Sequence, residues 1–247
     1  MTSSAVQQIS TVTQNLWVQL LDQLQLISQQ YPDAVFANSL AAEDMVIEHA
    51  IRQQNLAITS FMLDTGRLPK ETLALAKRVE QQYQSAITVL HPDTEAVVAH
   101  VAEHGAYAFY DSLSLRQACC QLRKVQPLQR YLQGKSAWIT GQRREQSQTR
   151  TQLQAHEHDM QFGLEKFNPL CDWHTDNVWE VIRALDIPYN PLHDQGYPSI
   201  GCEPCTRAIR PGEDLRAGRW WWEQRHSVEC GLHAAPLSQS STTQELS

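Results

Sequence analysis

Short apolar segments alternate with helical stretches through much of this 247-residue chain. Residues 34–38, 56–63, 87–90 and 137–140 are rich in aliphatic side chains and are bounded by polar or turn-forming residues, which is typical of buried strands. Short strands that alternate with helices favour a parallel sheet covered by helices on both faces. The sequence therefore predicts an α/β fold whose ligand lies beyond the carboxyl ends of the strands.

The helical stretches follow from spacing and from helix-starting residues. Leu16, Leu20 and Leu24 recur at helical spacing, so the Gln-rich start is an amphipathic helix that ends before Tyr31-Pro32. Further helices are expected at residues 43–53, after Pro69, at 94–104, at 113–132 and at 176–185, where Asp176 is the expected N-cap. Dense Gly and Pro after Pro191 predict irregular structure. The expected units are an N-terminal helix at 1–30, a domain at 31–225 and a mobile tail at 226–247.

Charge and hydropathy narrow the function classes. The net charge is −7, yet fifteen of the twenty Lys and Arg residues lie between residues 116 and 225. An acidic chain with a local group of arginines suits a small anionic ligand better than a nucleic acid, although the thirteen acids of the same segment are an alternative partner for them. Without a secretory signal or a long apolar run, we expect a soluble, cytoplasmic protein that does not bind membranes.

Four of the six cysteines form two pairs, Cys119-Cys120 and Cys202/Cys205. In a reducing compartment, clustered cysteines are more often metal ligands or catalytic thiols than disulfides. Four thiolates suit zinc or an iron–sulfur cluster, and two adjacent cysteines are unusual for zinc, which favours the cluster. Structural zinc and a redox dithiol at Cys202/Cys205 are the alternatives. Lys124 follows Cys120 by one helical turn and is expected to face the same side.

Cys230 has no neighbouring cysteine, and Cys171 is expected to be a small buried hydrophobe. Basic side chains that lower a thiol pKa surround Cys230 in the sequence: Arg216, Arg219, Arg225, His226 and His233. This setting favours a thiolate nucleophile. A free thiol without a role is the alternative.

Three loops follow the predicted strands. Residues 39–44 lie between a strand and a helix N-terminus, where backbone N–H groups meet phosphates, although an ordinary connection is equally typical of this pattern. Residues 63–67 offer backbone groups to a base or ribose. Arg143 and Arg144 stand side by side after the last strand, which indicates a phosphate or sulfate partner unless Glu145 neutralises one of them.

Six motifs occur in order over residues 39–233: Ser-Leu-Ala-Ala-Glu-Asp at 39–44, Leu-Asp-Thr-Gly-Arg at 63–67, Cys-Cys-x-x-x-Lys at 119–124, Thr-Gly-x-Arg-Arg at 140–144, the Gly-Cys-x-Pro-Cys-Thr-Arg to Trp-Trp-Trp-Glu segment at 201–223, and Glu-Cys-Gly-Leu-His at 229–233. Together they resemble the motifs of iron–sulfur assimilatory adenylylsulfate (APS) reductases in the phosphoadenylylsulfate (PAPS) reductase family. The resemblance implies an adenine nucleotide α-hydrolase-like, Rossmann-like sheet with a flexible C-terminal segment.

The resemblance also implies a mechanism and its partners. The Cys230 thiolate would attack the sulfur of APS, release AMP and leave a thiosulfonate, which thioredoxin or glutaredoxin would reduce to free sulfite for cysteine biosynthesis. Cys119, Cys120, Cys202 and Cys205 would bind a [4Fe-4S] cluster with an electrostatic or positioning role. A homo-oligomer is compatible with this reading.

The substrate contacts carried over by the resemblance fall in the same motifs. The expected residues are Ser39, Leu63, Thr65, Lys124, Gly141, Arg143, Arg144, Arg150, Arg216, Arg219 and His233. Ala41 departs from the family, which usually has Gly there, and its methyl group would restrict the loop if φ must be positive. The alternatives are a PAPS reductase that yields adenosine 3′,5′-bisphosphate, an ATP-cleaving ligase or thiolase of the same fold, and a non-enzymatic zinc or cluster redox module.

Overall fold

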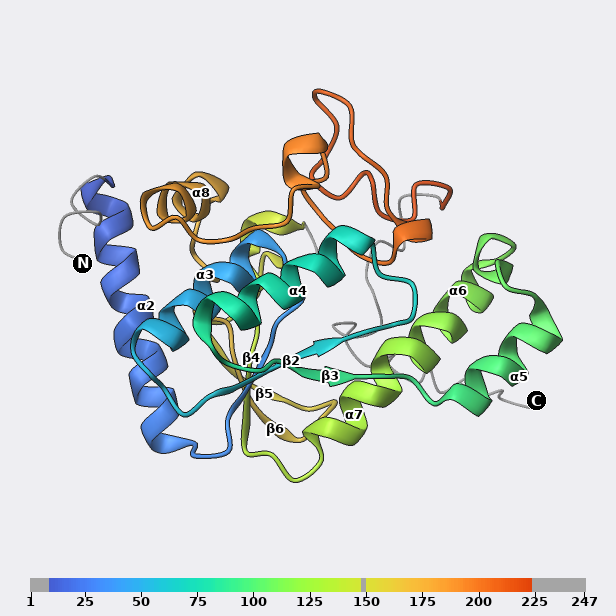
Figure 1. Ribbon diagram of the computed structural model, residues 1–247, viewed down its shortest axis with the longest axis horizontal. Helices are drawn as coiled ribbons and strands as arrows, with labels where there is room; N and C mark the ends of the chain where they lie inside the picture. The colour runs from blue at the N-terminus through green and yellow to red at the C-terminus, as the bar shows by residue number, and fades with distance from the viewer. Residues whose placement is uncertain (1–8, 148–149, 224–247) are drawn as a thin grey trace, which may run out of the picture.

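A six-stranded sheet forms the centre of the protein, whose computed structural model describes residues 9–147 and 150–223 (Figure 1). The strand order is β3-β2-β1-β4-β6-β5. All neighbouring strands are parallel except β5, which pairs antiparallel with β6. The strands are β1 (Val35–Ala37), β2 (Thr59–Leu63), β3 (Thr88–Leu90), β4 (Ala137–Ile139), β5 (His156–Asp159) and β6 (Leu164–Phe167). The predicted α/β sheet is confirmed, with an antiparallel edge strand added.

Helices cover both faces of this sheet (Figure 1). Successive residues of a strand point to opposite faces, so one strand contributes side chains to two cores. Phe36 belongs to the larger core, and its neighbour Val35 belongs to the smaller core on the other face. The larger core is built on α2 (Thr11–Gln30), α3 (Ala42–Gln53), α4 (Lys70–Tyr83) and α8 (Thr175–Ala184). The smaller core packs β-strand residues against α7 (Gln126–Leu132), and α5 (Thr94–His104) and α6 (Leu113–Cys120) extend beyond it.

Most predicted elements are present, with three corrections. The expected helix at 113–132 is interrupted by a π-helical turn, η2 (Gln121–Val125), between α6 and α7. Such turns occur often at functional sites, and this one carries Lys124. The N-cap of α8 is His174, so the prediction of Asp176 was wrong. Strands β5 and β6 were not predicted, because β5 is polar and half-exposed and lacks the apolar run used to find strands.

The chain changes direction across the sheet between β1 and β4. From β1 it continues to β2 and β3 on one side, whereas β4 pairs with the other edge of β1. The loops after these two strands therefore diverge, which leaves the crevice where open α/β sheets bind ligands.

The segment after α8 is irregular, as its Gly and Pro content predicts. Up to residue 223 it contains only short 3₁₀ turns, including η5 (His193–Gln195) and η6 (Glu203–Cys205), and a single bridge between Thr206 and Arg219. None of the described helices combines the length and the apolar composition needed to cross a bilayer. The predicted mobile tail at 226–247 lies outside the described residues, as do residues 1–8.

Candidate functional site

A pocket of about 620 Å³ lies at the carboxyl edge of the sheet. It brings together side chains that are far apart in the sequence, among them nine of the predicted substrate-binding residues: Ser39, Leu63, Thr65, Lys124, Gly141, Arg143, Arg150, Arg216 and Arg219. Arg144 does not line this pocket. Cys230 and His233 lie outside the described residues. The pocket therefore has the position that the fold predicts for a ligand, and a strongly basic wall.

Asp44 joins the two loops at the change of chain direction. Its Oδ2 accepts hydrogen bonds from the Ser39 backbone N–H at 2.7 Å and from Ser39 Oγ at 2.6 Å. On its other side, a Cβ placed on Gly141 would overlap Asp44 Oδ1, so only glycine allows this approach. The 39–44 loop is thus held from within by a carboxylate, and the N–H of Ser39 is directed to it.

Burial raises the pKa of Asp44 to about 7 from its ordinary value of 3.8, although hydrogen bonds from Ser39 lower it. The folded protein therefore keeps a proton that the unfolded chain releases between these values. Stability falls as the pH rises through this window, by about 2 to 3 kcal/mol from about pH 5 to about pH 8. Asp44→Asn carries no charge, so we expect its free energy of unfolding, relative to wild type, to rise by that amount over the same interval. Urea unfolding at the two pH values measures this, and an equal difference at both would contradict it.

Leu40 holds the one backbone conformation in the 39–44 loop that favours glycine. Its φ is 63°, and its N–H donates to Asn38 Oδ1 at 2.8 Å. Asn38 Nδ2 donates to the buried Glu48 at 3.1 Å, which fixes the amide orientation. Ala41 has φ −72°, so its methyl group imposes no strain, and the restriction of the loop that a positive φ would have caused does not arise.

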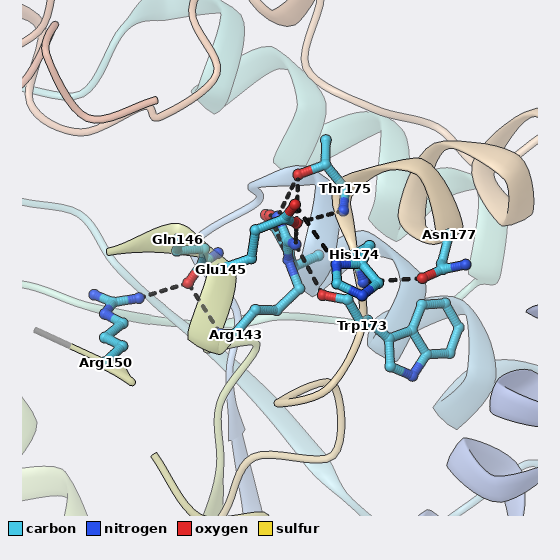
Figure 2. A network of polar contacts seen from close by, with 9 residues as sticks. Arg143, Glu145, Gln146, Arg150, Trp173, His174, Thr175 and Asn177 are labelled. Atoms are coloured by element: carbon cyan, nitrogen blue, oxygen red, sulfur yellow. Dashed lines mark hydrogen bonds and ion pairs between the residues drawn. The ribbon is translucent and has the colours of Figure 1, made fainter. Parts of the chain in front are cut away.

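Arg143 is buried and enclosed by two carboxylates (Figure 2). Its guanidinium donates to Glu43 Oε1 at 2.7 Å, to Glu145 Oε2 at 2.8 Å and to the Trp173 carbonyl at 3.0 Å. Glu145 also accepts the Thr175 backbone N–H at 2.6 Å, at the start of α8. Although burial raises the pKa of Glu145, the hydrogen bonds from Thr175 and Arg143 hold it below its ordinary value. Arg143 therefore ties three segments together.

The second arginine of the pair points elsewhere. Arg144 forms an ion pair with Asp172, and its Nε donates to the Leu153 carbonyl at 2.8 Å. The two adjacent guanidiniums are thus separated by acids, which was the alternative to a shared anion. Gln146 lies nearer the pocket, where its Oε1 accepts from the Arg143 backbone N–H at 3.1 Å and from Arg150 at 2.5 Å (Figure 2). Gln146 thereby orients Arg150 at the pocket wall.

The four paired cysteines gather beside this pocket. Cys119 and Cys120 end α6, Cys202 is the N-cap of η6, and Cys205 is its last residue. Burial is the main cause that raises the pKa of the Cys205 thiol to about 12; the nearby Cys202 and Cys119 act in the same direction, and Lys124 acts against them. These thiols are close enough to shift one another's pKa values, so the two cysteine motifs lie next to each other in the fold.

Cations and aromatic rings enclose these thiols. Arg116 is buried, its guanidinium lies 4.5 Å from the ring centroid of Trp220, and it pairs with both oxygens of Glu223 at 2.8 and 2.9 Å. The hydroxyl of Tyr110 donates to the carbonyl of Pro204, between the two cysteines, at 2.6 Å. In the described part of the chain, no three Cys, His, Asp or Glu side chains are grouped as around a single metal ion.

The donor set fits an iron–sulfur cluster. Four thiols come from two segments, and the guanidinium of Arg123 lowers the pKa of Cys119 against the dominant effect of burial, which raises it. Cationic surroundings suit an anionic, sulfur-rich group. Cys171 is buried, as predicted, and its thiol contacts Asp172.

The pocket and the thiols share one wall. The Thr65 hydroxyl lies 3.2 Å from Cys202 Sγ. Lys124 and Arg219 line the pocket and also lower the pKa of Cys205. Arg219 donates to the Ile200 carbonyl at 3.1 Å, and its buried Nε has no hydrogen-bond partner among the described residues. A buried donor without a partner at a pocket wall calls for an acceptor, which a ligand or a water molecule can supply.

Part of the pocket wall was missed from the sequence. Trp179 and Arg183 of α8, together with Tyr189, His193 and Ile200, also line the pocket. Burial lowers the pKa of His193. Two of these residues lie on a helix and three in the irregular segment after it. Neither segment has a recognisable binding motif, so their spacing in the sequence did not identify them.

Known proteins share both the sequence and this architecture. Residues 33–208 match the family model of the phosphoadenosine phosphosulfate reductase domain. The chain is 54% identical to an adenosine 5′-phosphosulfate reductase of Burkholderia cepacia over 86% of this chain and 85% of that protein. It is also 54% identical to one of Allochromatium vinosum, over 87% and 83%.

Two solved structures show the likeness of the fold. A phosphoadenylyl-sulfate reductase of Candida auris in a phosphate complex has a TM-score of 0.65 and 26% identity, covering 77% of this chain and 90% of that one. An FMN adenylyltransferase of Candida glabrata has a TM-score of 0.58 and 12% identity, covering 89% and 78%, and shares the fold alone. The adenine nucleotide α-hydrolase-like fold expected from the motifs is thereby confirmed.

Proposed function

The chain belongs to the phosphoadenosine phosphosulfate reductase family, and we propose that it reduces APS to sulfite and AMP within sulfate assimilation. The observation that carries this proposal is the pocket at the change of chain direction, whose basic wall adjoins four grouped thiols. The identity of about half of all aligned positions to APS reductases supports the choice of substrate.

Two groups of pocket residues would bind the two parts of the substrate. The loops of Ser39 and Gly141 at the ends of β1 and β4, with Leu63 and Thr65 after β2, would hold the nucleotide. Lys124, Arg216 and Arg219 would face the phosphosulfate, with Arg150 as a further cation. Breaking the sulfur–oxygen bond places negative charge on the departing phosphate. Cations that are already in position stabilise this transition state more than the ground state.

The nucleophile in this proposal is Cys230. Its thiolate forms a bond to the sulfur of APS, the sulfur–oxygen bond breaks, and AMP leaves with the electron pair. A thiolate of a dithiol protein such as thioredoxin or glutaredoxin then attacks Cys230 Sγ and expels sulfite. The second thiol of that protein releases Cys230, so the dithiol is oxidised to a disulfide and supplies both electrons. His233 would assist near the sulfonate.

Cys119, Cys120, Cys202 and Cys205 would hold the [4Fe-4S] cluster. When bound, the cluster supplies a fixed charged group beside the substrate, and the electrons come from thiols. Lys124 would connect the cluster with the substrate, because it lowers the pKa of Cys205 and also lines the pocket. Thr65 would orient Cys202 through its hydroxyl.

Sulfite release tests the substrate. With thioredoxin present, we expect a higher kcat/KM for APS than for PAPS, whose 3′-phosphate adds two negative charges and several acceptor oxygens that the site would have to satisfy. Release of AMP without pyrophosphate would separate the reaction from that of an ATP-cleaving ligase. Faster turnover of PAPS than of APS would contradict the proposed substrate, and the absence of sulfite from both would contradict the enzyme.

A further inference from the structure

Three exposed aromatic side chains form what we term the outer aromatic patch: Tyr107, Tyr110 and Trp221, exposed by 63%, 39% and 42%. The rings of Tyr107 and Tyr110 are stacked with centroids 6.5 Å apart, and that of Trp221 lies 6.3 Å from Tyr110. Arg67 adds a cation 5.4 Å from the centre of the Tyr107 ring. Grouped exposed aromatic side chains beside an arginine are typical of protein-binding surfaces, where Tyr, Trp and Arg are enriched.

The patch is held firmly to the segment that carries the second cysteine pair. The Tyr110 hydroxyl donates to the Pro204 carbonyl, and the Glu203 backbone N–H donates to the Arg67 carbonyl at 2.8 Å. The ring of Trp222 packs edge-on against Tyr110, with the two ring centroids 4.4 Å apart. Rings that are already fixed lose little conformational entropy when a partner binds.

The position of the patch relative to Cys230 follows from the chain. Glu223 is the last described residue before the tail, and Arg116 anchors it through two hydrogen bonds. Cys230 lies seven residues further on, so its sulfur stays within about 25 Å of Glu223 even if the tail is fully extended. Trp221 lies two residues before Glu223. A protein that reaches the sulfur on Cys230 is therefore within range of the exposed patch.

We propose that the outer aromatic patch is the docking surface for the dithiol protein that reduces the Cys230 adduct. The proposal rests on the proposed function and adds where the reductant binds. The occupant is a protein whose reactive dithiol is framed by apolar surface, because flat aromatic rings offer large apolar contact with few hydrogen-bonding groups. A small thiol reductant needs no such surface.

The test compares two reductants on one pair of variants. Tyr107→Ala/Trp221→Ala removes the two most exposed rings, and Val98→Ala/Met160→Ala is the matched control, since Val98 and Met160 are 62% and 80% exposed apolar residues elsewhere. Mass spectrometry after mixing with APS alone measures the sulfonate adduct. We expect both variants to form it at the wild-type rate and to release sulfite normally with dithiothreitol. With thioredoxin, the patch variant should lose about tenfold or more in kcat/KM, as loss of central aromatic contacts does.

Each other outcome overturns the proposal. An unchanged rate with thioredoxin shows that the patch does not dock it. An equal loss with both reductants shows that the rings support the tail or the site instead. A change in sedimentation from an assembly to a monomer identifies a second copy of the chain as the occupant. Failure of the proposed function is seen separately, as a wild-type protein that forms no adduct with APS.

Discussion

Cys230→Ser is expected to abolish sulfite formation while the iron content and the visible absorption of the proposed cluster stay at the wild-type level. A serine hydroxyl is hardly ionised at neutral pH, whereas a thiol beside basic groups is largely thiolate, and the thiolate is the reactive form. Loss of a covalent nucleophile lowers turnover by about 1,000-fold or more. The sulfonate adduct formed with APS alone should also disappear, since no other step in the proposal precedes it.

The matched control for this variant is Cys171→Ser. Cys171 is buried, its thiol contacts Asp172, and burial raises its pKa to about 11, so it is a poor nucleophile at neutral pH. We expect Cys171→Ser to keep both the adduct and the turnover. Sulfite formation by Cys230→Ser at a rate near that of wild type would show that another group attacks the sulfur. An adduct on Cys171 would identify that group.

Much of the fold follows from local patterns. The central strands are apolar because both faces of the sheet are covered, so β1, β2 and β4 stand out in the sequence. Helix α5 was predicted with its observed limits, and Asp93 caps it by accepting the Ala96 N–H. Strand β5 could not be found in this way, because it lies at the sheet edge and half of its side chains are exposed. The π-helical turn likewise has no pattern that separates it from a helix.

The site was predicted less completely, because its key contacts join residues far apart. The sequence showed two adjacent arginines, but not that Glu43, from a helix one hundred residues earlier, would neutralise Arg143. Asp44 was noted only as part of a loop motif, and its role as the link to Gly141 depends on the packing of two strand ends. Local residue types thus indicate which chemistry is present. Only the fold shows which charges remain for a ligand.

A substitution in the second cysteine pair is expected to remove iron as well as turnover, unlike Cys230→Ser. Cys202→Ser is expected to lose the visible absorption, most of the iron and the sulfite formation together, because Cys202 is buried and a serine there is a poor iron ligand. Loss of a residue that supports a metal ligand lowers metal affinity or activity roughly 10- to 100-fold, and loss of the ligand itself should lower them further. Thr65→Ala provides that milder comparison, since the Thr65 hydroxyl contacts the same sulfur.

Metal analysis and absorption distinguish the possible outcomes for Cys202. Iron that is lost from Cys202→Ser but kept in Cys230→Ser assigns the two cysteine groups to different roles. Stoichiometric zinc in colourless, active wild-type protein would instead favour a zinc site and contradict the cluster. Full turnover by iron-free Cys202→Ser would show that the grouped thiols are not needed for the reaction. The cations on the shared wall, Lys124 and Arg219, would then act on the substrate alone.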